Sequence, residues 1–322
     1  MENNSLSKYH KSLVIFIDIL ETKDNNNFDS LFKVNKLFRK LTKEQEEQDN
    51  KEHNLHRIYK RTIFSFSDCA YIIYDYKDGI EENRKNDTTL SWVALYNTVY
   101  MLQELIKDGY VFRGGITFGD VYYDKNENIV FGPAIVEAYE LESKYAKNPR
   151  VLIQDNLATK ILKYHNDIKD KLKSKKNICP GISSINGDNG EIINKDFEDS
   201  KYYINYFNNI DCDKEKLKKF ILGQLKRAKN KNSIKLMKKY FWLSEYYKNE
   251  VIGIEKDYKS VMLMAAGLEK GDEFSKYKYI IREYELEHNN INITLNKQEY
   301  DFIKSKDENY INNLIISKMS EK

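Results

Sequence analysis

Two acidic residues, Asp18 and Asp68, and one arginine, Arg113, have the types and spacing that phosphate chemistry requires. Asp18 follows the apolar run 13–17 in the stretch SLVIFIDIL, and so short a run rich in Val, Ile and Phe predicts a buried central strand. A carboxylate at the end of such a strand is costly unless it is paired, hydrogen-bonded or bound to a cation. Asp18 is therefore a candidate functional group, with a structural acid satisfied by its neighbours as the alternative.

Asp68 lies between two aromatic and β-branched runs, 57–66 and 70–76, which predict a β-hairpin with the acid at its turn. If this hairpin lies beside the strand at 13–20, both carboxylates reach the same edge of the sheet. Two carboxylates close together share a proton or bind cations, and hard oxygen ligands suit Mg²⁺ or Mn²⁺ completed by substrate phosphates. A pair of such ions activates an attacking hydroxyl and stabilises the leaving oxygen. The alternative for Asp68 is an ordinary turn residue.

Arg113 precedes two glycines, Gly114 and Gly115, in the sequence VFRGGITFG. Glycine inside a strand marks a bulge or the close approach of a ligand or another backbone. A guanidinium beside exposed backbone amides predicts a phosphate contact. The alternative is an arginine at a strand edge that pairs with a surface acid.

The elements that must position these residues follow from the spacing of apolar side chains. Their order, β-α-β-β-α-β followed by β-α-β, predicts an α+β fold, most economically a ferredoxin-like palm. The predicted strands are 13–20, 57–66, 70–76, 110–123, 129–131 and 150–153, and the predicted helices are 28–41, 90–105 and one that begins at Pro133.

The character of the chain changes after residue 160, where lysines become frequent and helical patterns dominate. We therefore predict two domains, one over 1–160 that carries the candidate site and a mostly helical appendage of unknown role over 161–322. Helical patterns in the second part lie at 217–228, 234–249 and 257–268.

Composition excludes several classes of protein. The chain has 322 residues with 53 Lys and Arg against 50 Asp and Glu, and a net charge of +3 argues against a dedicated nucleic-acid-binding protein. Its three cysteines have no paired spacing, which indicates neither a zinc site nor a disulfide framework and fits a reducing compartment. No apolar run approaches the roughly 18–20 residues needed to span a bilayer. We expect a cytoplasmic protein without a membrane partner.

Four motifs follow one another along the first half of the chain: FIDIL at 16–20, SFSDCAYII at 65–73, RGGITFGDVY at 113–122 and FGPAIVEAYELES at 131–143. In their order and spacing they resemble the catalytic domains of class III nucleotidyl cyclases. The resemblance implies a homodimer that closes nucleotide sites at its interface, with two Mn²⁺ or Mg²⁺ ions per site held by Asp18, Asp68 and the backbone carbonyl of Ile19. It further implies that the ribose 3′-hydroxyl of a nucleoside triphosphate attacks the α-phosphate and expels pyrophosphate, with Arg113 beside the phosphates.

Three departures from the family bear on the substrate. The adenine-selecting Lys of the family falls on Phe64, and its transition-state Asn and Arg fall on Val136 and Glu140. The sequence is most similar to the pyrimidine cyclases of the Pycsar anti-phage system, whose cyclic UMP or cyclic CMP activates a separate effector protein. We assign Phe16 and Phe64, with Arg113, to nucleotide binding. Phe64 would stack on a pyrimidine base, and its alternative is a core phenylalanine.

Two other functions compete with a pyrimidine cyclase. One is a palm-type synthase of cyclic oligonucleotides, although the sequence FSFSD differs from the Gly-Gly-Asp hairpin of such enzymes. The other is a catalytically degenerate nucleotide sensor on the same fold, which the loss of the family's Asn and Arg motivates. The mass of any product separates the three hypotheses.

Overall fold

The computed structural model describes residues 9–20, 28–49, 58–173, 192–196, 199–231 and 233–252. The chain divides into two compact units, one up to residue 210 and one from residue 211 onward. The elements of the first unit are β1 (His10–Ile19), α1 (Phe28–Asp49), β2 (Tyr59–Phe66), β3 (Cys69–Tyr76), η2 (Glu82–Arg84), α2 (Asp87–Lys107), β4 (Phe112–Asp124), β5 (Ile129–Phe131), α3 (Pro133–Glu140), the π-helical turn η3 (Leu141–Tyr145), β6 (Val151–Ile153), α4 (Asp155–Lys173), β7 (Ile193–Lys195) and β8 (Tyr202–Ile204).

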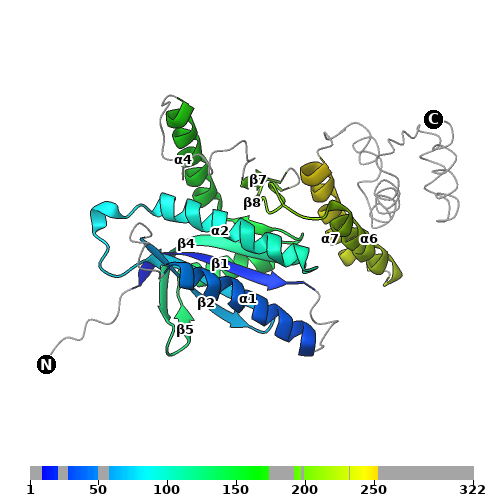
Figure 1. The fold of residues 1–322 in the computed structure, drawn as a ribbon, viewed down its shortest axis with the longest axis horizontal. Coiled ribbons are helices and arrows are strands. Elements are labelled where there is room, and N and C mark those ends of the chain that lie inside the picture. The colour runs from blue at the N-terminus through cyan, green and yellow to red at the C-terminus, as the bar shows by residue number, and fades with distance from the viewer. Residues whose placement is uncertain are drawn as a thin grey trace. The chain divides into compact units, whose positions relative to one another are not determined.

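The first unit is an α+β structure built on one mixed sheet (Figure 1). The strands lie in the order β2-β3-β1-β4-β6-β8-β7, and β5 pairs with β4. Every described pair is antiparallel except β4 with β6. The predicted α+β class and the order of elements from β1 to β6 are confirmed, because apolar periodicity specifies each of these elements locally.

Strand β1 lies between β3 and β4 and buries side chains on both faces, as its continuous apolar run predicts. Val14 and Phe16 pack in one cluster with apolar residues of α3. Successive side chains of a strand point to opposite faces, so Leu13, Ile15 and Ile17, each fully buried, face the other side. Helices α1 and α2 pack on the strands and lie over the sheet in Figure 1.

The structure corrects the prediction for residues after 160. The stretch that follows α4 adds β7 and β8 to the sheet, with β8 paired to β6, so the predicted boundary at 160 falls inside the first unit. These strands are too short to give a periodic signal, and their pairing depends on contacts with distant strands. The helix predicted at 257–268 lies outside the described residues.

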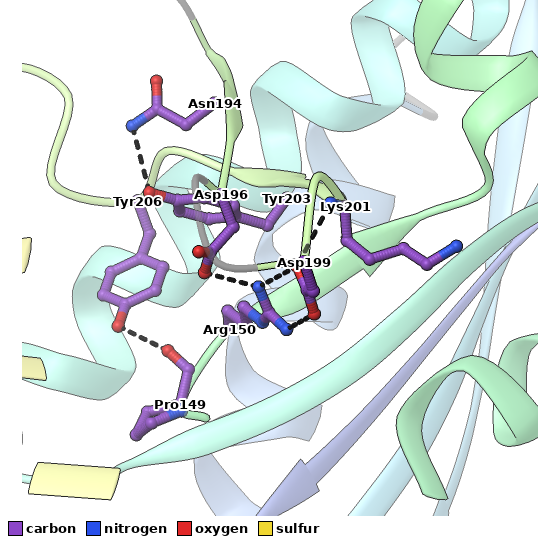
Figure 2. Close-up of polar contacts among 8 residues, drawn as sticks. All are labelled: Pro149, Arg150, Asn194, Asp196, Asp199, Lys201, Tyr203 and Tyr206. Carbon is purple, nitrogen blue, oxygen red and sulfur yellow. Dashed lines mark hydrogen bonds and ion pairs between the residues drawn. The ribbon is translucent and has the colours of Figure 1, made fainter. Parts of the chain in front are cut away.

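A buried ion-pair cluster around Arg150 fastens the β7–β8 hairpin to the sheet (Figure 2). The Arg150 Nη1 atom donates to Asp196 Oδ2 at 2.5 Å and to Asp199 Oδ1 at 3.0 Å, and Nη2 donates to the second oxygen of Asp199. Burial raises the pKa of Asp199, but hydrogen bonds from Arg150 and from the backbone N–H of Lys201 outweigh it and hold the pKa below its ordinary value. The ion pair between Arg150 and Asp199 therefore contributes its stability with the Asp199 carboxylate ionised.

The second unit contains α6 (Lys214–Asn230), α7 (Ile234–Tyr247) and the π-helical turn η4 (Lys248–Ile252). The two helices pack on each other, and Ser233 caps α7 by accepting a hydrogen bond from the Leu236 N–H at 3.4 Å. The helices predicted at 217–228 and 234–249 are confirmed. Among the residues described, no helix combines the length and the apolar character needed to cross a membrane.

Candidate functional site

Asp18 is the penultimate residue of β1, at the point where the buried strand reaches the surface. The five residues before it are at most 5% exposed, whereas the Asp18 side chain is 23% exposed. The sheet register places Asp18 opposite Cys69 of β3 on one side and Arg113 of β4 on the other. The central strand therefore presents its acid between two neighbouring strands.

Asp68 lies in the turn of the β2–β3 hairpin and is tied to the end of β1. The Ile19 N–H donates to the carbonyl oxygen of Asp68 at 3.0 Å. Asn35 of α1 donates to the carbonyl of Ser67, which has a positive φ of 50°. Helix α1 and strand β1 thus hold this turn from two directions, and the structure brings Asp18 and Asp68 to the same edge of the sheet.

Arg113 of β4 is shared between two carboxylates. Its Nε and Nη2 atoms lie 3.3 and 3.2 Å from the same oxygen, Oδ2 of Asp18. Its Nε atom also lies 2.5 Å from Oε1 of Glu142, whose side chain is only 3% exposed. Arg113 therefore pairs with acids, as the alternative expected, but not with an ordinary surface acid. One partner is the buried Glu142, and the other is the candidate residue Asp18.

Glu142, which belongs to the π-helical turn η3 after α3, was not predicted from the sequence as a site residue. Its spacing from the buried residues of α3 could have indicated that its side chain points inward. Ala134 and Ala138 form the buried stripe of α3, and Glu142 is the next residue at the same four-residue spacing. An acid on the inward stripe of an amphipathic helix needs a partner inside the protein.

The site is rich in negative charge. Burial raises the pKa of Asp18, the charge and hydrogen bond of Arg113 lower it, and the nearby charge of Asp68 raises it; the net direction is upward. Burial and the charges of Asp18, Asp68 and Glu142 together raise the pKa of the Cys69 thiol to about 11. Cys69 is therefore protonated at neutral pH, and the carboxylates of Asp18 and Glu142 share the Arg113 guanidinium.

The glycines after Arg113 allow a close approach of backbone rather than of a ligand. The Gly114 N–H donates to the carbonyl of Arg150 at 3.2 Å, so this amide is used within the sheet. A Cβ atom on Gly115 would lie 2.2 Å from the carbonyl oxygen of Ala138 and 2.7 Å from the Cβ of Leu141. The absence of a side chain at Gly115 lets the end of α3 lie directly on β4, which brings Glu142 to Arg113.

Gly115→Ala is expected to destabilise the first unit by about 1–3 kcal/mol, because the new methyl group overlaps the backbone of α3 and forces it away from β4. Urea unfolding measures the change. The control is Gly223→Ala in α6, where a Cβ meets nothing within 4 Å and the substitution is expected to stabilise by about 0.5–1 kcal/mol. Equal stability of the wild type and the Gly115 variant would contradict the close-packing role.

The two phenylalanines assigned to nucleotide binding are core residues in this structure. Phe64 is 2% exposed and Phe16 is 5% exposed, and both belong to the apolar cluster beneath α3. Neither ring offers a face on which a base could stack. The Phe16 ring is 4.6 Å from the ring of Tyr71 and 5.7 Å from that of Tyr139, which is 50% exposed. Aromatic surface near the carboxylates is therefore supplied by tyrosine.

Val136 and Glu140 face the solvent from α3. Val136 is 56% exposed, and Glu140 forms an ion pair with Lys144 at 2.6 Å on the helix surface. The contacts described above among Asp18, Arg113 and Glu142 involve neither side chain. Within this single chain, no group from these two positions therefore joins the carboxylate site.

The donor chemistry of the site fits a hard divalent cation. Asp18 and the half-buried Asp68 supply carboxylate oxygens at an accessible edge of the sheet. Across the parts of the chain that the structure describes, no group of three or more His, Cys, Asp or Glu side chains has the arrangement of a metal site. An ion would therefore be held by the two aspartates, with water and substrate phosphates in its other positions.

Comparison with known proteins gives no independent assignment. No protein-family model matches the chain, and no curated protein matches it. The functional conclusion rests on the chemistry of the site and on the resemblance of its motifs.

Proposed function

We propose that this chain is a metal-dependent pyrimidine nucleotide cyclase that converts UTP or CTP to the 3′,5′-cyclic monophosphate and pyrophosphate. The observation that carries the proposal is the convergence of Asp18 and Asp68 at one edge of the sheet with Arg113 beside them. Two carboxylates and a guanidinium are the groups that cation-assisted phosphoryl chemistry requires.

The arrangement of strands supports the finer assignment of the fold. A ferredoxin-like palm interleaves two βαβ units in a single antiparallel sheet. The element order β1-α1-β2-β3-α2-β4 and the spatial order β2-β3-β1-β4 are compatible with that assignment. We therefore propose that the first unit is a ferredoxin-like palm.

In the proposed reaction, the ribose 3′-oxygen forms a bond to the α-phosphorus while the bond to pyrophosphate breaks, and the hydroxyl proton is released. Two Mn²⁺ or Mg²⁺ ions held by Asp18, Asp68 and the backbone carbonyl of Ile19 would supply charge stabilisation for this step. Arg113 would contact the phosphates through its guanidinium. A homodimer would close the site, and the cyclic product would act in the cytoplasm on a separate effector in anti-phage defence.

A degenerate nucleotide sensor is the second candidate. The solvent-facing positions of Val136 and Glu140 favour it, because neither residue supplies the amide or guanidinium that the family uses there. A sensor would bind a nucleoside triphosphate tightly without releasing pyrophosphate.

One assay separates these functions. The purified protein is incubated with Mn²⁺ and each of the four nucleoside triphosphates, and the products are identified by mass. A cyclic monophosphate formed from UTP or CTP supports the proposal. A product with more than one nucleotide per ring indicates an oligonucleotide synthase, and tight binding without pyrophosphate release indicates a sensor; either result overturns the cyclase.

A further inference from the structure

Arg113 binds the same Asp18 carboxylate that would bind a cation. Both of its contacts to Asp18 converge on one carboxylate oxygen, Oδ2, at 3.3 and 3.2 Å. A divalent cation bound by the same carboxylate would lie close to the guanidinium, and like charges at short range repel. Arg113 therefore serves as the internal counter-ion of Asp18, and a cation must compete with it.

Glu142 is placed to keep Arg113 in the site when a cation displaces Arg113 from Asp18. Its Oε1 atom lies 2.5 Å from Nε of Arg113, and its side chain is 3% exposed, compared with 23% for Asp18. Glu142 is also fixed in position, because Gly115 lets the end of α3 lie against β4. A buried carboxylate attracts a guanidinium more strongly than a partly exposed one at a strand end, because the effective dielectric constant around it is lower.

We infer that Glu142 is a positioning residue that retains Arg113 by its Nε atom when a divalent cation takes Asp18. The inference rests on the proposed function, because it concerns the same metal-binding carboxylates. In the exchange, Arg113 gives up both of its contacts to Oδ2 of Asp18, through Nε and through Nη2, and the Nη2 end of the guanidinium becomes available to a substrate phosphate. Cation binding and preparation of the phosphate contact are thereby coupled through one side chain.

The inference predicts opposite effects of two substitutions on Mn²⁺ binding, measured by electron paramagnetic resonance with Mn²⁺ as the only added ligand. Glu142→Gln is expected to weaken Mn²⁺ binding about 10–100-fold, as the loss of a supporting contact around a metal site does, because Asp18 then remains the charged partner of Arg113. Arg113→Gln is expected to tighten Mn²⁺ binding, because it removes the competing charge. Arg113→Lys keeps a positive charge that competes with the cation and is therefore expected to tighten Mn²⁺ binding less than Arg113→Gln does.

A double-mutant cycle tests whether Glu142 acts through Arg113. In the Arg113→Gln background, Glu142→Gln is expected to change Mn²⁺ affinity by less than about threefold, well below its effect in the wild type. The matched control is Glu140→Gln on the same helical segment, which removes one negative charge from the surface and is expected to leave affinity within about twofold. Circular dichroism confirms that each variant is folded.

The outcomes separate this inference from the proposed function. If the wild type binds Mn²⁺ but Arg113→Gln fails to tighten binding, or if Glu142→Gln is equally harmful in both backgrounds, the inference is overturned and the cyclase proposal stands. If the wild type binds no Mn²⁺, with or without UTP and CTP, the metal site of the proposed function fails, and the inference fails with it.

Discussion

Asp18→Asn is expected to reduce cyclase activity at least about 100-fold while leaving the folded state no less stable than the wild type. The substitution preserves the size of the side chain and removes the negative charge that would hold the cations. Arg113 keeps its contact with Glu142, so the substitution does not leave the guanidinium without an acidic partner. Activity is measured by pyrophosphate release from UTP and CTP with Mn²⁺.

The effect on stability follows from the raised pKa of Asp18, whose first cause is burial. A folded state that raises the pKa of an acid binds its proton more tightly than the unfolded state does, so ionisation of Asp18 costs stability at neutral pH. As the pH falls through the folded pKa, the wild type gains stability relative to Asp18→Asn. Thermal unfolding of both proteins across this range checks the sign.

Asp120→Asn is the matched control for the loss of activity. Asp120 also belongs to the sheet, but its carboxylate is 40% exposed and pairs with Lys11 at 2.8 Å on the surface. This variant is expected to retain wild-type activity. If Asp18→Asn is as active as Asp120→Asn, the carboxylates at the end of β1 do not hold catalytic cations.

Arg150→Met is expected to lower the free energy of unfolding by about 3–5 kcal/mol, the largest effect on stability that we predict. The side chains of Arg150 and Asp196 are each only 2% exposed, so removal of the guanidinium leaves a buried carboxylate without its main cation (Figure 2). At the same time, Asp196 and Asp199 of the β7–β8 hairpin lose their ion pairs to Arg150, which precedes β6. Urea unfolding gives the free energy.

Two further variants test the origin of this loss. Combining Arg150→Met with Asp196→Leu is expected to recover most of the stability, because replacement of a whole buried ion pair by apolar side chains is often neutral. Lys11→Met, which removes a surface pair with Asp120, is expected to cost only about 0–1 kcal/mol. A loss in Arg150→Met no larger than that in Lys11→Met would show that the cluster does not anchor the hairpin.

The local pattern of the sequence was sufficient for the elements that frame the site. The apolar run before Asp18 predicted the central strand, and the two β-branched runs around Asp68 predicted the hairpin. Side-chain periodicity specifies such elements because each strand or helix buries a defined face. Residues at the ends of neighbouring strands lie at the same edge of a sheet. The convergence of Asp18 and Asp68 could therefore also be predicted from the sequence.

Only the tertiary structure decided which partners these residues have. The ion pair of Arg113 with Glu142, the burial of Phe64 and the closeness of Gly115 to α3 join residues that are distant in the sequence. The addition of β7 and β8 to the sheet has the same origin. A periodic pattern indicates which face of an element is buried, but the packing of whole elements determines what that face meets. The sequence by itself therefore identified Asp18, Asp68 and Arg113, and the packing of α3 on β4 brought the buried acid Glu142 to Arg113.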